Sequence, residues 1–361
     1  MENPDMNKMP KKQIFSAQID LSKFEKATDE EKRQQDVMGE SRTFFKDGMR
    51  KLMKNPLAVA SIIVLICIIL TIIIAPMIVP YRYDEILSVN GKRDKGAKNL
   101  APFTYSEAEQ KLIASGGERF PHILGTDEQC RDYFIRVIYG TRVSLVVGLF
   151  TSIIVLIIGM LYGSIAGYAG GKADLIMMRI VDMIYSLPDM LVVILLSVVL
   201  QQVLVLKSNS PLAALGTNMV SLFIVFGLLY WVGMARLIRA QILSQREQEY
   251  VTAAKAMGVR EKSIVFRHIL PNILSLILVT ATLDFATCML TESTLSYLGF
   301  GISPPTPTWG NMLTGANNSI VIQQYWWRWV FPALIFGICT ICINLVGDSL
   351  RDAVDPKSNG R

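Results

Sequence analysis

Six long apolar runs constrain this chain more than any other feature of its sequence. They occupy residues 57–79, 143–169, 180–206, 217–238, 273–298 and 329–346. An α-helix needs about 20 mostly apolar residues to cross the hydrocarbon core of a bilayer, and it satisfies its own backbone hydrogen bonds there. With 51% hydrophobic and only 18% charged residues, the chain is too apolar for an ordinary soluble domain. The runs therefore predict an all-α membrane protein with six transmembrane helices.

The basic residues predict how the chain is oriented. Lysine and arginine collect before the first run, in the loop 236–267 and after the last run, whereas only Lys207 and Arg328 follow the third and fifth runs. Because loops rich in these residues stay in the cytoplasm, we expect cytoplasmic termini and a cytoplasmic central loop. The net charge of +6 is thus a topology signal, and we expect no nucleic-acid partner.

The composition changes along the chain and predicts its organisation. We expect a flexible cytoplasmic tail over residues 1–43, an amphipathic basic helix at the membrane surface over 44–56, a first span over 57–80, an extracytoplasmic segment over 81–140, a core of five further spans over 141–356 and a tail over 357–361. Within the extracytoplasmic segment, residues 81–117 predict an irregular surface insert. The first apolar run begins too deep and is too long for a cleavable signal peptide.

The polar segment 249–272, EYVTAAKAMGVREKSIVFRHILPN, is predicted to be a docking element. Helix is favoured up to Met257, Gly258 is suited to end it, and residues 263–269 can form a second short helix before Pro271. Three small side chains leave the first helix with a narrow face that another protein can approach, namely Ala253, Ala254 and Ala256. A charged loop that only solvates the protein is the alternative.

Residue types that carry catalysis or bind metals are not grouped. His122 and His268 lie far apart, so no metal cluster is expected, and Cys339 and Cys342 sit in an apolar run, where they are small packing residues. The chain also has no GxxxxGK[ST] phosphate loop, since Ala166 stands where the first glycine would precede Gly171-Lys172. We expect no catalytic residue and no ATP hydrolysis by this chain.

Polar residues form a stripe in the fifth run. Thr280, Asp284, Thr287, Thr291 and Thr294 recur at steps of three and four, and Glu292 lies about a quarter turn away. Charges at membrane depth are functional candidates. We therefore predict Asp284, Thr287, Thr291 and Glu292 as candidates for a translocation path, with hydrogen bonding between packed helices as the equal alternative.

Two further runs carry packing signals. Gly159, Gly163 and Gly167 are spaced four apart in the second run, which predicts close approach of another helix. In the third run Pro188 predicts a kink, and Asp189 beside it faces either a cavity or the membrane interface.

Five stretches resemble, in order, the C-type permease subunits of bacterial ABC importers for dipeptides and oligopeptides. Thr252-Ala253-Ala254, Gly258 and Leu270-Pro271 resemble the EAA loop of that family, with Thr252 in place of glutamate and Glu249 nearby. The segment before the second run matches at His122, Leu124, Gly125, Thr126, Asp127, Arg131 and Asp132, with Cys130 in place of glycine. Three more stretches match: the start of the third run, the segment after the fifth run, and residues 347–356.

The resemblance implies an ABC type I importer permease fold. It also implies that the chain crosses a bacterial inner membrane several times. It implies as partners a homologous second permease, two ABC ATP-binding subunits and an extracytoplasmic peptide-binding lipoprotein. ATP and Mg are then used by the partners, with no cofactor bound by this chain.

The resemblance also implies roles for residues. The loop 246–271 would couple to an ATPase through Glu249, Tyr250, Thr252, Ala253, Ala254, Gly258, Leu270 and Pro271. Gly299, Gly301, Pro304, Pro305 and Trp309 would form a rigid outer-face loop, in a gate or on the surface that receives a delivering protein, with the two adjacent prolines as an extended piece.

Other functions remain open at this point. Within the family the cargo could be a nickel chelate, glutathione or an antimicrobial peptide. An ion-coupled secondary transporter with Asp284 and Glu292 as its relay predicts internal repeats, and none is visible. An intramembrane protease that pairs Asp189 with Asp284 has no supporting motif.

Overall fold

A computed structural model describes residues 44–204 and 216–354 of this chain. The tails predicted over 1–43 and 357–361 lie outside the described residues. Residues from Asp47 onward form one compact unit.

The described residues are mainly helical. The longer helices are α2 (Phe44–Lys54), α3 (Pro56–Ile78), α4 (Glu107–Ala114), α5 (Tyr133–Ala169), α6 (Gly171–Tyr185), α7 (Asp189–Val203), α8 (Thr217–Leu229), α9 (Trp231–Arg246), α10 (Glu249–Ala256), α12 (Leu270–Tyr297) and α15 (Trp327–Val354). The shorter elements are β1 (Ser88–Val89), β2 (Lys92–Arg93), η2 (Lys95–Ala97), α11 (Glu261–Ser263), η4 (Ile264–Ile269), α13 (Trp309–Leu313), η5 (Thr314–Asn317) and α14 (Ser319–Gln324).

The spans agree with the prediction except for the third one. Among the described residues, five helices are long and apolar enough to cross a membrane, and α6 with α7 makes a sixth when the pair counts as one span. That pair is bent by 84°, so the kink predicted at Pro188 is in fact a break. The reason is that proline cannot donate a backbone hydrogen bond and its ring excludes the preceding turn, and residues 186–188 leave the helix altogether.

The basic helix predicted over 44–56 corresponds to α2, which ends at Lys54, and its position at the membrane surface stays a prediction. Asn55 separates it from α3, and the Asn55 side chain accepts a hydrogen bond of 3.0 Å from the Leu57 amide. Pro56 then occupies the first turn of α3, where a missing amide hydrogen is tolerated. The first span therefore begins at a proper helix cap.

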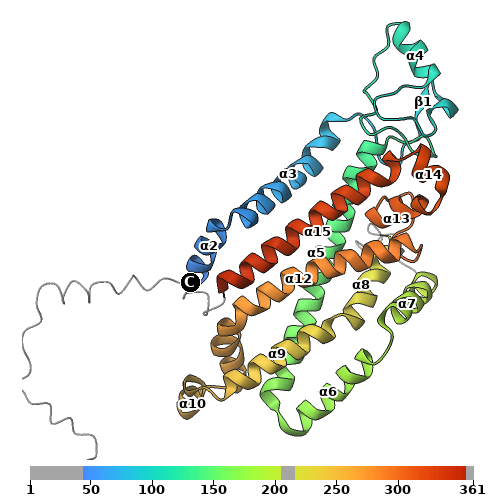
Figure 1. The fold of residues 1–361 in the computed structure, drawn as a ribbon. Helices are drawn as coiled ribbons and strands as arrows, with labels where there is room; N and C mark the ends of the chain where they lie inside the picture. Colours follow the sequence, from blue (N-terminus) through green and yellow to red (C-terminus); the bar gives the residue numbers. More distant parts are fainter. Residues whose placement is uncertain (1–43, 205–215, 355–361) are drawn as a thin grey trace, which may run out of the picture. The chain divides into compact units, whose positions relative to one another are not determined.

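Helix α5 is the central element of the fold. It has 37 residues, which corresponds to about 55 Å at 1.5 Å per residue. It contacts α3, α8, α9 and α12, and Figure 1 shows it running through the middle of the helices. Because it is longer than the roughly 30 Å hydrocarbon core of a bilayer, its two ends emerge on opposite sides of a membrane.

The glycines of α5 allow α9 to lie against it. A Cβ atom on Gly159 would lie 2.6 Å from Met234 Cβ, one on Gly163 would lie 2.5 Å from the Ala235 carbonyl oxygen, and one on Gly167 would lie 2.9 Å from the Arg239 carbonyl oxygen. All three distances are too short for a side chain. The predicted close helix packing is confirmed, and its partner is α9.

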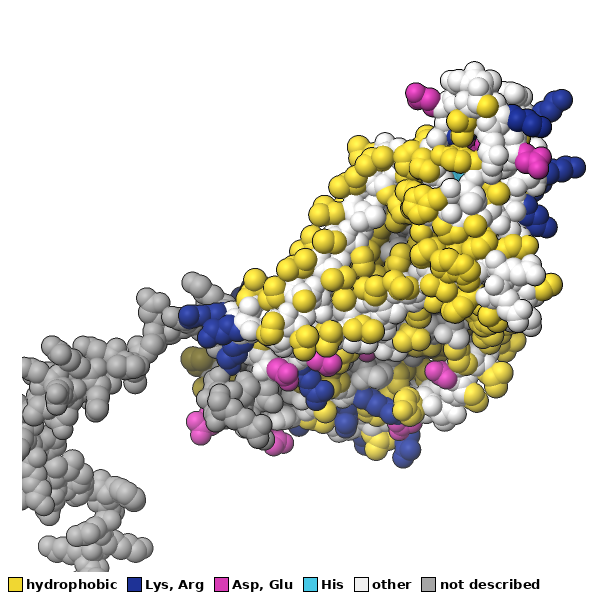
Figure 2. Space-filling view, turned by 45° about the horizontal axis from the view of Figure 1, so that its top comes forward, with side chains coloured by type: hydrophobic (Ala, Val, Ile, Leu, Met, Phe, Trp, Pro, Cys, Tyr) yellow, Lys and Arg dark blue, Asp and Glu magenta, His cyan; other side chains and the backbone are white. Residues whose placement is uncertain are grey.

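The remaining spans complete the membrane body. α12 packs against α5 and α15, α15 packs against α3, and α7 packs against α8. Figure 2 shows hydrophobic side chains over much of the visible face and charged side chains mainly toward its ends. This distribution fits a body surrounded by lipid, with water at both ends.

A folded cap stands on one end of the body, formed by residues 79–132. It contains the hairpin β1–β2, η2 and α4. The insert predicted to be irregular over 81–117 is thus regular in part, because local signals order these elements. Asn90 and Gly91 turn the hairpin with positive φ angles of 53° and 75°, and Ser106 with Glu109 forms a capping box at the start of α4.

The segment before the second run caps the start of α5. Asp132 is the N-cap of α5, and its side chain accepts a hydrogen bond of 3.1 Å from the Ile135 amide. Cys130, which replaces a glycine of the family pattern, has a φ angle of 62°. The turn therefore keeps the left-handed conformation that glycine adopts most easily.

A buried histidine joins α4 to the start of α5. His122 is fully buried, with Nδ1 2.8 Å from Asp132 Oδ2 and Nε2 3.2 Å from Glu109 Oε1. Burial by itself lowers the pKa of His122, but the hydrogen bonds to Asp132 and Glu109 outweigh it and raise this pKa to about 9. Burial raises the pKa of Glu109, and the hydrogen bond to His122 with its other partners brings it below its usual value.

These shifts predict how cap stability depends on pH. The raised pKa of His122 gives stability that is complete below about 6.5 and is lost as the pH rises through about 9. The lowered pKa of Glu109 gives stability that is present above about 4.5 and is lost as the pH falls. For the protein in detergent, His122→Gln should lower the unfolding midpoint at pH 6.5 and much less at pH 9.5. An equal effect at both values would contradict the charged state of His122.

Candidate functional site

The predicted docking segment folds as a short helix, a turn and a second helix. α10 ends at Ala256, and Gly258 follows with a φ angle of 76°. The Val259 amide donates to the Ala254 carbonyl at 3.1 Å, which closes the helix end. Glycine is needed here because a side chain would be strained at this φ, so the predicted stop at Gly258 is confirmed.

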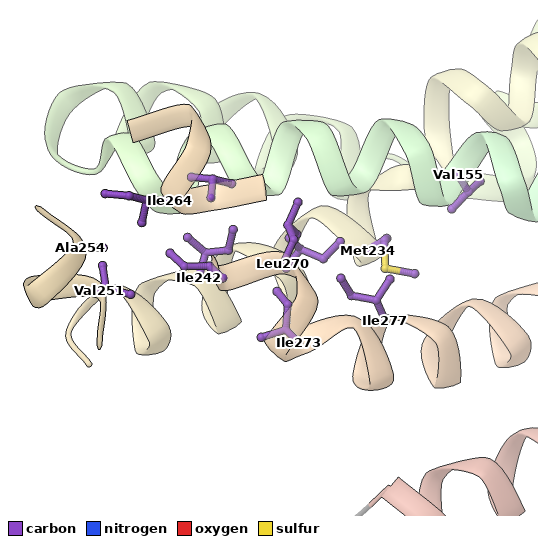
Figure 3. Packing of buried hydrophobic residues seen from close by; sticks show 12 residues of the cluster. Val155, Met234, Ile242, Val251, Ala254, Ile264, Leu270, Ile273 and Ile277 are labelled. Carbon is purple, nitrogen blue, oxygen red and sulfur yellow. The ribbon is translucent and has the colours of Figure 1, made fainter. Parts of the chain in front are cut away.

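The two faces of α10 differ. Val251 and Ala254 are buried and pack into a cluster with Ile242, Ile264 and Ile269, as Figure 3 shows for most of them. The opposite side is exposed, and we call it the docking face: Thr252, Ala253, Ala256, Met257 and Gly258. The prediction that all three alanines share one face is wrong for Ala254, because neighbouring helix positions are 100° apart.

The second half of the segment continues directly into a span. α11, η4 and α12 follow one another without a gap, and residues Glu261–Tyr297 count as one helix of 37 residues. The prediction that a short helix ends before Pro271 is therefore wrong. η4 is a π-helix in which the Leu270 amide donates to the Val265 carbonyl, and this wider turn leaves room for a proline that cannot donate.

Side chains fix α10 to the neighbouring helix ends. The Tyr250 hydroxyl donates to Gln245 Oε1 at 2.9 Å, and Lys255 Nζ lies 5.4 Å from the centre of the Tyr168 ring. Arg246 donates to the Tyr168 carbonyl at 3.0 Å. α10 is thus held to the ends of α5 and α9 while its docking face remains exposed.

The other residues predicted for this segment divide in the same way. Glu249 and Pro271 are exposed, Tyr250 is half-buried and Leu270 is buried. Met257, which the sequence interpretation did not select, is 76% exposed. An unbranched apolar side chain next to two alanines was the signal that could have identified it.

The predicted translocation candidates do not share one environment. On α12, Thr287 is exposed and Asp284 and Thr291 are half-buried. The hydroxyls of Thr287 and Thr291 donate to the carbonyls of Leu283 and Thr287 at 3.2 and 3.0 Å, and both of these hydrogen bonds lie within α12.

Glu292 is separate from this stripe. It is fully buried and accepts hydrogen bonds from Ser296 at 2.7 Å and Ser293 at 3.4 Å. Ser296 Oγ in turn accepts from the Ile302 amide at 3.1 Å. Glu292 therefore lies in the packing that holds the loop after α12.

A cavity of about 470 Å³ lies where the third span breaks. It is lined by Ile184, Tyr185, Leu187, Pro188, Asp189, Val192, Leu229, Tyr230, Val232 and Gly233. Asp189 is thus one of the residues that line this cavity, and its side chain is exposed. Tyr230 lies at the junction of α8 and α9 and hydrogen-bonds Thr291 of the stripe on α12, so the cavity and the stripe adjoin.

The predicted outer-face loop is anchored on the body of the protein. Trp309 is fully buried, and its indole nitrogen donates to Thr141 Oγ1 of α5 at 3.0 Å. A Cβ atom on Gly301 would lie 2.2 Å from Ser296 Oγ, and Gly299 has a φ angle of 87°. Trp309 is therefore an anchor of the loop and no part of its outer surface.

The extended piece predicted for the two prolines is wrong. Pro304 and Pro305 lie in a turn and are joined by a cis peptide bond. Asn311 donates to the carbonyls of Ile302 and Thr306 at 3.0 and 2.8 Å and so closes the loop around them. Arg136 of α5 reaches the Pro305 carbonyl at 3.3 Å.

The described residues contain no group of three or more metal-ligating side chains, and the described cysteines at positions 339 and 342 are free and buried. What the arrangement offers is a docking face at one end of α5, a cap at the other end, and a mainly apolar cavity with one carboxylate at the break of the third span. This combination suits the movement of a solute.

Comparisons with known proteins agree with this geometry. Residues 159–360 match the family of binding-protein-dependent transport system inner membrane components, and residues 43–102 match the N-terminal transmembrane domain of oligopeptide transport permease C.

Curated relatives match over nearly the whole chain. The oligopeptide transport system permease protein OppC of Haemophilus influenzae is 35% identical over 90% of this chain and 92% of the relative. The dipeptide transport system permease protein DppC of Bacillus subtilis is 37% identical over 88% of this chain and 87% of the relative. OppC of Escherichia coli K12 is 37% identical over 88% of this chain and 93% of the relative.

Proposed function

The chain belongs to the family of binding-protein-dependent transport system inner membrane components, and we propose that it is a permease subunit of an ATP-driven importer of dipeptides or oligopeptides. It is a membrane subunit that crosses the bacterial inner membrane several times. The names of its relatives support a peptide cargo.

The proposed assembly contains four kinds of subunit. Besides this chain it has a homologous second permease, two ABC ATP-binding subunits and an extracytoplasmic peptide-binding lipoprotein. ATP and Mg are used by the ATP-binding subunits. The absence of a GxxxxGK[ST] motif from the sequence supports this division of labour, because the permease then needs an external source of energy.

The observation that carries the proposal is the construction of α10. One face is packed on the body through Val251 and Ala254, while the docking face is exposed and made of small side chains and Met257. A surface of this kind fits into a cleft of another protein, and we place that protein, an ATP-binding subunit, in the cytoplasm. The basic loop around α10 supports the cytoplasmic assignment.

The same contacts suggest how movement reaches the spans. α10 is held to α9 through Tyr250 and Gln245, and the segment after it continues into α12 without a gap. When the ATP-binding subunits close on ATP, α10 moves with them and α9 and α12 follow as rigid bodies. The cavity at the break of the third span then opens to the other side of the membrane, as expected for a switch between two packed states.

Reconstitution tests this function. Proteoliposomes that contain the two permeases, the ATP-binding subunits and the binding protein should accumulate radiolabelled trialanine only when Mg and ATP reach the ATP-binding subunits. Uptake of a nickel chelate or of glutathione, with no uptake of peptide, would contradict the proposed cargo. Uptake that needs a proton gradient and no ATP would contradict the proposed class of transporter.

A further inference from the structure

Non-helical backbone borders the cavity at the break of the third span. Residues 186–188 are non-helical between α6 and α7, and the two helices meet at 84°. Within a membrane, non-helical backbone is tolerated only where protein buries it or where it lines a water-filled cavity. Because the cavity lies directly at this break, we infer that water enters it.

One side chain brings charge to this cavity. Asp189 is the first residue of α7 and is exposed, and no described residue donates a hydrogen bond to it or forms an ion pair with it. An ionisable residue at membrane depth is expensive and marks a functional site by default. The positive end of the α7 dipole stabilises a negative charge at this position, so the cavity carries a carboxylate that is open to a ligand.

An arginine beside the cavity lining is already engaged. Arg236 forms an ion pair of 2.7 Å with Asp182, and its guanidinium lies 4.3 Å from the centre of the Tyr185 ring. The cavity lining itself contains Asp189 and no lysine or arginine. A ligand that compensates Asp189 has to supply the positive charge.

We propose that this cavity binds the ammonium group of the passing peptide, with the Asp189 carboxylate as its acceptor. Tyr230 also lines the cavity and supplies an aromatic ring, and aromatic faces attract ammonium groups. The inference rests on the peptide cargo proposed above. An unmodified peptide of any sequence carries an ammonium group at its amino terminus, so one carboxylate serves cargoes with different side chains.

The size and lining of the cavity agree with such a ligand. Its volume of about 470 Å³ lies in the range of about 300–1,000 Å³ that is usual for sites of small molecules. Most of its lining is apolar, which admits varied side chains without selecting one. A Cβ atom added to Gly233 would meet nothing within 4 Å, so a larger residue there would fill the cavity without displacing protein atoms.

The test compares peptides that differ only in their ammonium groups. The reconstituted complex is given three peptides. Trialanine carries an ammonium group at its amino terminus, N-acetyl-Ala-Lys-Ala carries one on its lysine side chain, and N-acetyl-trialanine carries none. Uptake of each is measured with wild-type protein and with Asp189→Asn. The same binding protein delivers the peptides to the wild-type and the variant complex. Its own preference among peptides therefore cancels when the ratio of uptakes measured with Asp189→Asn is divided by the ratio measured with wild-type protein.

We expect Asp189→Asn to lower the uptake of trialanine relative to N-acetyl-trialanine by about 10-fold, the value of one hydrogen bond to a charged group. A similar loss for N-acetyl-Ala-Lys-Ala shows that the site accepts either ammonium group, and a loss for trialanine alone restricts it to the amino terminus. Asp189→Glu should retain the wild-type preference. A ratio unchanged by Asp189→Asn overturns the inference, whereas wild-type complex that transports none of the peptides overturns the proposed function itself.

A steric variant gives a second, independent readout. Gly233→Val should slow the uptake of trialanine while the ATP-binding subunits remain bound, because it fills the cavity. Gly337→Val is the matched control, since Gly337 lies within the span formed by α15 and also has no atom within 4 Å of an added Cβ. Equal uptake by the two variants overturns the placement of the peptide in this cavity.

Discussion

Replacing Ala253 with glutamate should detach the ATP-binding subunits and stop ATP-dependent uptake. Ala253 is exposed on the docking face, next to the buried Ala254. A carboxylate forced into a contact without a partner costs on the order of 2–5 kcal/mol, which corresponds to more than about 30-fold in affinity. Co-purification of the ATP-binding subunits and uptake of trialanine should fall together.

The control for this variant is Ala114→Glu. Ala114 is also exposed and is the last residue of α4, a helix of eight residues like α10. It lies in the cap, at the opposite end of α5, so the ATP-binding subunits should remain bound. If Ala253→Glu leaves both co-purification and uptake at wild-type levels, α10 is not the coupling element.

Gly163→Leu should prevent the body from folding. The Cβ atom alone would lie 2.5 Å from the Ala235 carbonyl oxygen and 3.0 Å from Ile238 Cβ, and backbone atoms cannot move aside as flexible side chains do. Overpacking of a core costs about 1–3 kcal/mol when neighbours can adjust, and here they cannot. We expect loss of monodisperse protein in detergent, measured by size-exclusion chromatography and by the unfolding midpoint.

Gly337→Leu is the matched change for this prediction. Gly337 is on a long apolar helix too, but its added Cβ meets nothing within 4 Å. This variant should remain monodisperse with an unfolding midpoint close to that of the wild type. Similar behaviour of the two variants would show that α5 and α9 tolerate separation.

The sequence predicted those features that depend on the chemistry of neighbouring residues or on the regular spacing of residues along a helix. Gly159, Gly163 and Gly167 repeat at the spacing of one helix face, which is enough to predict a close helix contact. Asp132 precedes an apolar run with the side chain of a helix cap. Gly258 marks the end of α10 because few other residues adopt its positive φ.

The sequence did not predict features that depend on contacts between distant segments. Glu109, His122 and Asp132 come together only when the cap folds, so the segment 81–117 looked irregular. Glu292 and Thr291 are adjacent in sequence, yet one is fully buried with Ser296 and the other contacts Tyr230. No periodicity distinguishes a lipid face, a packed face and a cavity face on the same helix.

Proline was the least reliable guide, because its effect depends on the turn around it. Pro188 directly precedes α7 at a break where α6 and α7 meet at 84°, whereas Pro271 lies inside a helix that continues to Tyr297. The π-helix η4 makes the difference, since its wider turn precedes Pro271 directly. The sequence alone shows a proline in both places.

The central claim is that ATP hydrolysis by ATP-binding subunits drives this permease, which does not transport solute without them. It is tested most directly by the uptake of trialanine into proteoliposomes that hold both permeases with the binding protein, with and without the ATP-binding subunits. We predict uptake only when those subunits, Mg and ATP are all supplied. Accumulation of trialanine by the permeases alone, driven by an ion gradient, would contradict the account.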